Sequence, residues 1–131
     1  MAVTNGPNIP VMTATLLGDS YLADGNKMLR MLQALVQPVA ISKDFVDPSL
    51  ITPVNGDRYI VGTGGTGAWS GHDADIAYWT TDDASHPTGV WEFYTPKDGW
   101  MVFLLDPVFK TPNCIYVFIT GSGWTQLVCL P

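Results

Sequence analysis

The residues with the clearest chemical potential lie in and just after a glycine-rich segment of this 131-residue sequence. Residues 62–67 (GTGGTG) follow the apolar run RYIV and match the spacing of a dinucleotide-binding loop. Such a loop binds pyrophosphate only when its last glycine begins a helix. Here the sequence continues as AWSGHDADIAYW, which alternates like a strand, and no Lys-Ser or Lys-Thr follows the glycines. We therefore expect a connection between strands, with no nucleotide and no other cofactor.

Two groups of acidic and histidine residues follow this loop, residues 72–75 (HDAD) and 82–86 (DDASH). On an extended strand, Asp73 and Asp75 would share one face while His72 pointed to the other, so three ligands would not converge on one ion. We expect these side chains to be solvated or bonded to nearby backbone, and we expect no metal site. A loop that brought them together would favour calcium over zinc, because the donors are mainly oxygens.

The sequence holds no set of residues typical of nucleophilic or acid-base catalysis. No serine lies in a G-x-S-x-G motif, and Cys114 and Cys129 lie in apolar runs. Glu92 and Asp98 lie near aromatic residues, but nothing in the sequence pairs them as glycosidase carboxylates. We therefore expect a protein that is not an enzyme. The cysteines are expected to act as small buried hydrophobes in a reducing cytosol, and a disulfide would require the last two strands to pair.

Glycine precedes tryptophan, directly or by one residue, at four places in the second half of the chain. Glycine suits the tight turn and tryptophan the buried anchor at a strand start. We assign structural roles in turns and anchors to Gly67, Trp69, Trp91, Gly99, Trp100 and Trp124. The aromatic residues are expected mainly in the core; a subunit interface and a platform for stacking sugars are the alternatives.

The elements that must position these residues begin with one short helix, over about residues 24–37. Five apolar residues recur at helical spacing and form one face: Met28, Leu29, Leu32, Leu35 and Val36. Asp24 suits the N-cap, and Pro38 ends the helix. A helix this short needs its apolar face covered, either by its own β domain or by other subunits, so these five residues are candidates for an oligomer interface.

Short runs rich in β-branched and aromatic residues fill the chain from about residue 57 onward. We expect a mostly β fold, a small antiparallel sandwich or barrel of hairpins. An extended arm over residues 1–20 precedes a single helix-plus-β domain over residues 21–131. The arm is expected to be held by a neighbouring subunit.

The net charge of −6 argues against nucleic-acid binding, because phosphate contacts need clustered Lys and Arg residues. We therefore expect no nucleic-acid partner. No stretch has the features of a signal peptide or the length of an apolar membrane span. Only 14% of the residues are charged and 47% are apolar. This leaves much uncharged surface, so we expect a homo-oligomer assembled in the cytoplasm.

A series of short motifs resembles a domain family of unknown function found in phage tail and fibre proteins and in gene-transfer-agent particles. The motifs cover about residues 19–124 and are, in order, Tyr21-Leu22-Ala23, Leu32-Gln33-Ala34-Leu35-Val36, Asn55-Gly56-Asp57-Arg58-Tyr59-Ile60-Val61-Gly62, Gly67-Ala68-Trp69-Ser70-Gly71-His72, Ile76-Ala77-Tyr78-Trp79, Trp91-Glu92-Phe93, Pro96-Lys97-Asp98-Gly99-Trp100 and Gly123-Trp124.

The resemblance implies a virion component, typically in trimeric fibre or spike assemblies, and it brings no catalytic residue. Its expected partners are other virion proteins. The sequence departs from the family pattern at Gly25-Asn26-Lys27 and ends seven residues after Trp124. We therefore expect a fibre or spike subunit, or the protein that anchors or decorates one on head or tail. Of these, an anchoring, adaptor or surface-decorating role fits the sequence better. The alternative is a carbohydrate-binding module that attaches the virion to a host surface glycan.

Overall fold

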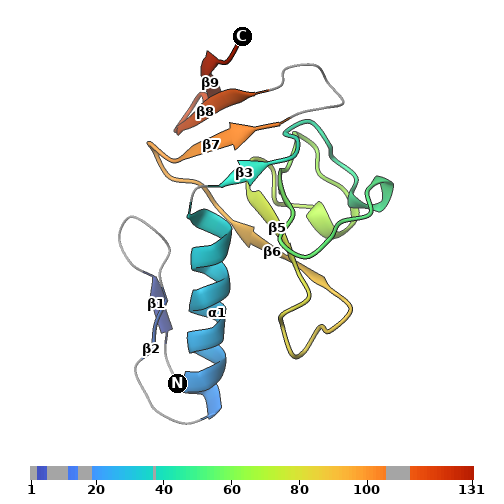
Figure 1. The fold of residues 1–131 in the computed structure, drawn as a ribbon, viewed down its shortest axis with the longest axis vertical. Coiled ribbons are helices and arrows are strands. Elements are labelled where there is room, and N and C mark those ends of the chain that lie inside the picture. The colour runs from blue at the N-terminus through green and yellow to red at the C-terminus, as the bar shows by residue number, and fades with distance from the viewer. Residues whose placement is uncertain (1–2, 6–11, 15–18, 37, 106–112) are drawn as a thin grey trace. The chain divides into compact units, whose positions relative to one another are not determined.

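The chain forms two compact units, Met1–Val36 and Gln37–Pro131. The computed structural model describes residues 3–5, 12–14, 19–36, 38–105 and 113–131. The first unit contains an antiparallel pair of strands, β1 (Val3–Asn5) and β2 (Met12–Ala14), and the helix α1 (Asp19–Leu35). β2 lies beside α1 (Figure 1). The described parts of residues 1–20 thus include a strand pair where we expected an extended arm, and the helix belongs to this unit.

The helix begins five residues before its predicted start, so Asp24 lies inside it and is not the N-cap. The predicted start was wrong because Gly25 and Asn26 are weak helix formers, and such residues usually mark the end of a helix rather than its interior. The end of the helix at Leu35 precedes Pro38, which cannot supply a helical N–H and restricts the residue before it. In the described part of the chain, no helix combines the length and apolarity that a membrane crossing requires.

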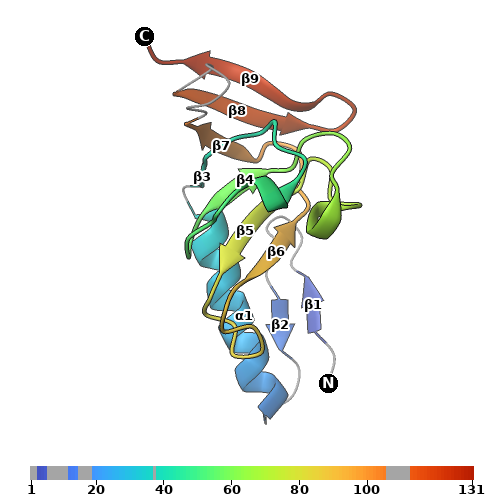
Figure 2. The ribbon, with the colours of Figure 1, turned by 90° about the vertical axis from the view of Figure 1, so that its right-hand side faces the viewer.

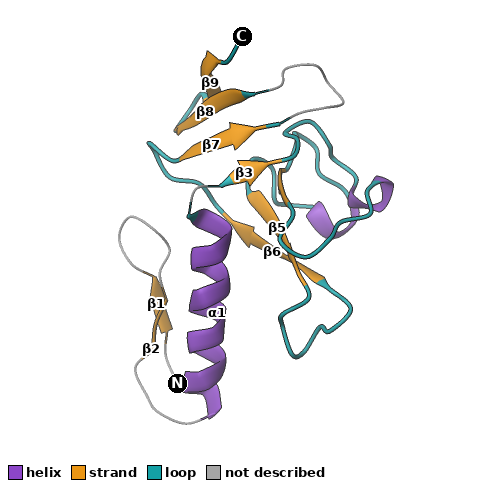
Figure 3. Ribbon diagram, viewed as in Figure 1, coloured by secondary structure: helices purple, strands orange, loops and turns teal. Residues whose placement is uncertain are grey.

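The second unit is built from strands, which confirms the predicted mostly β fold. A four-stranded sheet has the order β3-β7-β8-β9 and a three-stranded sheet the order β4-β5-β6. The strands are β3 (Val39–Ala40), β4 (Arg58–Ile60), β5 (Ile76–Thr80), β6 (Val90–Tyr94), β7 (Met101–Leu104), β8 (Cys114–Ile119) and β9 (Gly123–Cys129). Neighbours pair antiparallel except β3 and β7, which are parallel. Loops connect these strands, and two 3₁₀ helices, η1 (Pro48–Leu50) and η2 (Gly67–Trp69), lie within the connections (Figure 3).

The segment 39–42 joins the two sheets through backbone hydrogen bonds on both of its sides. Leu105 N donates to Ala40 O at 3.0 Å on the side of the four-stranded sheet. On the other side, Ile41 N donates to Arg58 O and Ile60 N donates to Ser42 O, each at 2.8 Å. These bonds connect the four-stranded sheet to the three-stranded sheet within the second unit (Figure 2). This agrees with the expected sandwich or barrel-like class.

An aromatic core covers one face of the three-stranded sheet. Strand register places Tyr59, Ala77 and Phe93 side by side across β4, β5 and β6. Trp69, from η2, is fully buried against them, and Trp91 packs beside it. The period-2 alternation of β6 sends the rings of Trp91 and Phe93 to a common side, and Trp69 joins them from η2.

Cys114 and Cys129 form a disulfide, so the expectation of two free buried thiols was wrong. β8 and β9 pair antiparallel, and their register places the two cysteines directly opposite each other. A disulfide required the last two strands to pair, and the structure shows this pairing. The bond closes the hairpin at the end away from its turn.

Candidate functional site

Residues 62–67, which we call the glycine loop, are held in place by the side chain of Asp73. Gly64 N donates to Oδ2 of Asp73 and Gly65 N donates to Oδ1, both at 2.9 Å. These two bonds lower the pKa of Asp73 below its ordinary value, the bond from Gly64 first. The last glycine, Gly67, begins the three-residue η2 and not an α-helix. The loop is a strand connection, as predicted, and the amides that would bind a phosphate already bind Asp73.

His72 lies in a turn rather than on a strand, which corrects the predicted separation of His72 from Asp75. Ala74 has a φ of 68°, and Nδ1 of His72 lies 2.9 Å from Oδ2 of the buried Asp75. The imidazole stacks on the ring of Phe93, with centroids 3.6 Å apart. Asp73 points to the glycine loop instead. Within the described residues, no three side chains of the types that bind metals come together.

The second acidic group closes the loop between β5 and β6. Nδ1 of His86 lies 3.3 Å from Oδ2 of Asp83, and Oδ1 of Asp83 accepts a bond from Ser85 N. Asp82 accepts a bond from Nδ2 of Asn55 at 3.2 Å. The bond from Ser85 N to Asp83 is of the expected kind, to nearby backbone, whereas Asp82 is bound by the side chain of a residue 27 positions away.

Glu92 and Asp98 serve different parts of the fold. The hydroxyl of Tyr94 donates to Oε2 of Glu92 at 2.9 Å. Asp98 accepts a bond from Thr120 N across the β7–β8 hairpin, and this bond lowers the pKa of Asp98. Each carboxylate thus has a hydrogen-bond partner of its own.

The residues assigned to turns and anchors divide into three groups. Trp69 and Trp91 meet edge to face in the core, with ring centroids 5.2 Å apart. Gly67 and Gly99 have φ values of 57° and 89°, the left-handed region that favours glycine. Trp100 lies at the start of β7, where its carbonyl accepts a bond from Phe118 N. Trp124 is half-buried and lies outside the aromatic core.

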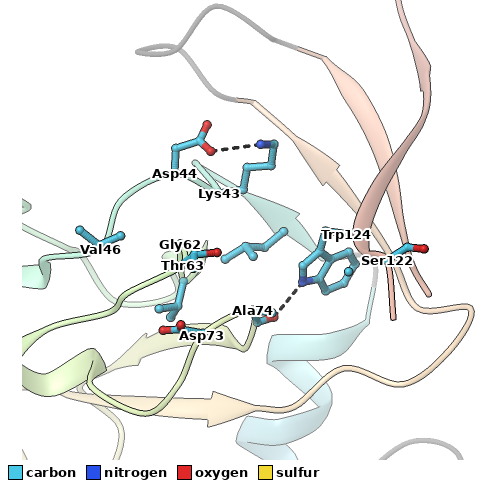
Figure 4. Close-up of a pocket in the computed structure, with 12 residues that line it drawn as sticks. Lys43, Asp44, Val46, Gly62, Thr63, Asp73, Ala74, Ser122 and Trp124 are labelled. Atoms are coloured by element: carbon cyan, nitrogen blue, oxygen red, sulfur yellow. Dashed lines mark hydrogen bonds and ion pairs between the residues drawn. The ribbon is translucent and has the colours of Figure 1, made fainter. Parts of the chain in front are cut away.

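Trp124 lies at the side of a surface pocket of about 430 Å³ within the second unit (Figure 4). Its indole Nε1 donates to Ala74 O at 2.8 Å, and Phe118 contacts the ring edge to face at 5.5 Å. The polar side chains that line the pocket are Lys43, Asp44, Thr63, Asp73 and Ser122. The sequence did not reveal this site, because these residues come from four separate segments of the chain: 43–44, 63, 73 and 122–124. The signal that the sequence offered was Trp124 directly after the turn glycine Gly123.

The five apolar residues predicted on the helix are all present on one side of α1. Leu29 and Val36 are each 61% exposed and Leu32 is 39% exposed, while Met28 and Leu35 are half-buried. The buried residues of this helix are instead Met31 and Ala34. The predicted stripe is therefore an apolar surface rather than part of the core.

Comparison with known proteins places the chain in a family. No curated protein and no solved structure matches it. A family model described as Protein of unknown function (DUF2793) matches residues 25–125, more than half of the chain. The match extends from α1 to β9 and includes the glycine loop, the aromatic core and the pocket beside Trp124. The chain belongs to the DUF2793 family.

Proposed function

We propose that this chain is a structural virion protein of a tailed bacteriophage. In this role it is a fibre or spike subunit, or the protein that anchors or decorates one on head or tail. It assembles with copies of itself, a trimer being favoured, and with other virion proteins in the host cytoplasm. The ordered motif series that resembles phage tail and fibre domains supports the phage assignment. One structural observation supports the assembly.

That observation is an open apolar face on the four-stranded sheet. Alternation along the strands places one set of side chains in the core, including Val102, Leu104 and Tyr116. The other set faces out across all four strands: Val39, Met101, Phe103, Ile115, Val117, Ile119 and Val128. We call these seven residues the outer sheet face. Met101 is 55% exposed, Val128 49%, Ile119 45% and Val39 38%.

A second copy of the chain is the occupant that suits the outer sheet face. None of its seven residues carries a charge, so two copies can meet there without the repulsion that a net charge of −6 otherwise produces. The core of a homo-oligomer interface is apolar and depleted of charge in the same way. An exposed apolar patch left open would also invite aggregation.

The exposed stripe on α1 supplies a second apolar surface. Leu29, Leu32 and Val36 are exposed, although most of the stability of a helix in a protein comes from packing of its apolar face. Of the two roles that the sequence allowed for this stripe, we propose contact between subunits. Both apolar surfaces thus favour assembly as the function.

The experiment is a measurement of mass in solution by light scattering. Wild-type protein is expected at a multiple of 14.2 kDa. Met101→Glu places a charge in the outer sheet face and is expected to weaken self-association at least tenfold, about 1.4 kcal/mol. Leu50→Glu is the matched control, because Leu50 is 72% exposed on η1, away from that face. A wild-type protein that remains monomeric at high concentration contradicts the assembly.

The phage assignment needs a separate measurement. Mass spectrometry of purified phage particles that encode the chain is expected to find it at a fixed copy number. Its absence from intact particles would contradict a virion role even if the isolated protein assembles.

A further inference from the structure

We propose that the pocket beside Trp124 binds a neutral pyranose unit of a polysaccharide. The site lies within one copy of the second unit, so it does not depend on the assembly proposed above. We call the residues Lys43, Asp44, Thr63, Asp73, Ser122 and Trp124 the sugar pocket. Figure 4 shows Trp124 and Ser122 on one side of it, with Asp44, Thr63 and Asp73 on the other.

Trp124 provides a fixed aromatic wall. The bond from its Nε1 to Ala74 O fixes the indole plane, and Phe118 supports the ring from the neighbouring strand. The negative face of an indole attracts the weakly positive C–H groups on one side of a pyranose ring. Because the side chain is already held, little conformational entropy is lost when a ligand binds.

The polar side chains offer both donors and acceptors to sugar hydroxyls. Nζ of Lys43 lies 3.1 Å from Oδ1 of Asp44, and both side chains are partly exposed. The ammonium donates hydrogen bonds, the carboxylate accepts them, and the hydroxyls of Thr63 and Ser122 do both. A sugar hydroxyl is likewise a donor and an acceptor, so this mixture is complementary to it.

The charge in the pocket selects neutral sugars. Asp44 and Asp73 bring two negative charges and Lys43 brings one positive charge. The backbone bonds that lower the pKa of Asp73 keep it ionised at neutral pH. A uronic acid or another anionic sugar would therefore be repelled.

The size of the sugar pocket also fits, since 430 Å³ lies in the lower part of the usual range for small-ligand sites, about 300–1,000 Å³. A second pocket of about 360 Å³ is lined by Trp79, Gly89, Trp91, Phe93, Ala68 and Val90. It has aromatic rings but no charged or hydroxyl side chain to orient a sugar. This second pocket provides the internal comparison for the test.

The test follows the indole N–H signals of the tryptophans by ¹H–¹⁵N NMR, with the Trp124 signal assigned from the Trp124→Phe variant. The probes are glucose, galactose, mannose, N-acetylglucosamine and their short oligomers, with glucuronic acid as the anionic probe. At least one neutral probe is expected to shift the Trp124 signal saturably, with a dissociation constant of about 1 mM. Glucuronic acid is expected to leave the signal unchanged, and the Trp79 signal is expected to remain constant with every probe.

Two variants separate direct binding from indirect effects. Lys43→Ala and Ser122→Ala are each expected to weaken binding about tenfold. The controls Lys97→Ala and Thr88→Ala remove a lysine and a hydroxyl side chain outside the sugar pocket, and they are expected to bind like wild type. The Met101→Glu variant, in which self-association is expected to be weaker, should bind the sugar equally well, which keeps this result independent of assembly.

Three outcomes would overturn the proposal. They are no saturable shift with any neutral probe, a shift of the Trp79 signal in place of the Trp124 signal, or equal affinity in the pocket variants and their controls.

Discussion

At the scale of single residues, acidic side chains in this chain mostly bind backbone N–H groups of turns. Asp73 binds the glycine loop, Asp98 binds Thr120, and Asp47 binds Ser49 at the start of η1. The sequence alone predicted this behaviour for carboxylates in glycine-rich turns. It did not predict the partners, because the turn that brings His72 to Asp75 contains a left-handed residue, Ala74, that no sequence pattern marks.

Asp73 makes the stability of the second unit depend on pH. Its backbone bonds lower the pKa of the folded carboxyl below the unfolded value of about 3.9. Its contribution is therefore fully present above that unfolded pKa and is lost as the pH falls through the lower folded pKa. Asp73→Asn removes a charged acceptor, so we expect lower stability at neutral pH and a smaller loss on acidification.

Urea unfolding followed by tryptophan fluorescence measures this at about pH 7 and about pH 3. The Asp98→Asn variant is a useful companion, because Asp98 has the same direction of shift at a different turn. An identical loss of stability with acid in wild type and Asp73→Asn would contradict the role given to Asp73.

At the scale of the elements, the strands were predictable and their connections were not. The runs DIAYWT, VWEFYT and CIYVFIT became β5, β6 and β8 because alternation and aromatic content mark a strand locally. β3 has only two residues, and its parallel pairing with β7 depends on a partner more than 60 residues away. The sugar pocket was missed for the same reason, since no local pattern relates Lys43 to Ser122.

The disulfide between β8 and β9 is expected to stabilise the edge of the four-stranded sheet, where β9 is the last strand. It joins residues 15 positions apart, and a closed loop of that length stabilises a protein by about 3 kcal/mol. We expect the double variant Cys114→Ala/Cys129→Ala to lose roughly that amount in urea unfolding. Reductant should lower the stability of wild type by a similar amount.

The double variant also serves as the control for the reductant. Its unfolding curve should be the same with and without reductant, because it has no bond to break. If reductant left the wild-type curve unchanged, the hairpin would owe its stability to packing and backbone bonds alone.

At the scale of the whole molecule, the two units present separate apolar surfaces under a net charge of −6. The outer sheet face belongs to the second unit and the α1 stripe to the first. Among the described residues of α1, Met31 and Ala34 are buried, whereas Leu29, Leu32 and Val36 of the stripe are exposed. We propose that these exposed side chains contact another subunit. If both surfaces join subunits, each should contribute to self-association independently of the other.

Leu29→Glu tests the helix contribution. Leu29 is 61% exposed, so the change is expected to leave the circular dichroism spectrum of the chain intact. It should weaken self-association about tenfold in light scattering, because it places a charge in an apolar contact. Asn26→Glu adds the same charge at an exposed polar position of α1 and should assemble like wild type. Equal weakening by both variants would show that the added charge acts at long range, and unchanged assembly of Leu29→Glu would leave the outer sheet face as the only subunit contact among these surfaces.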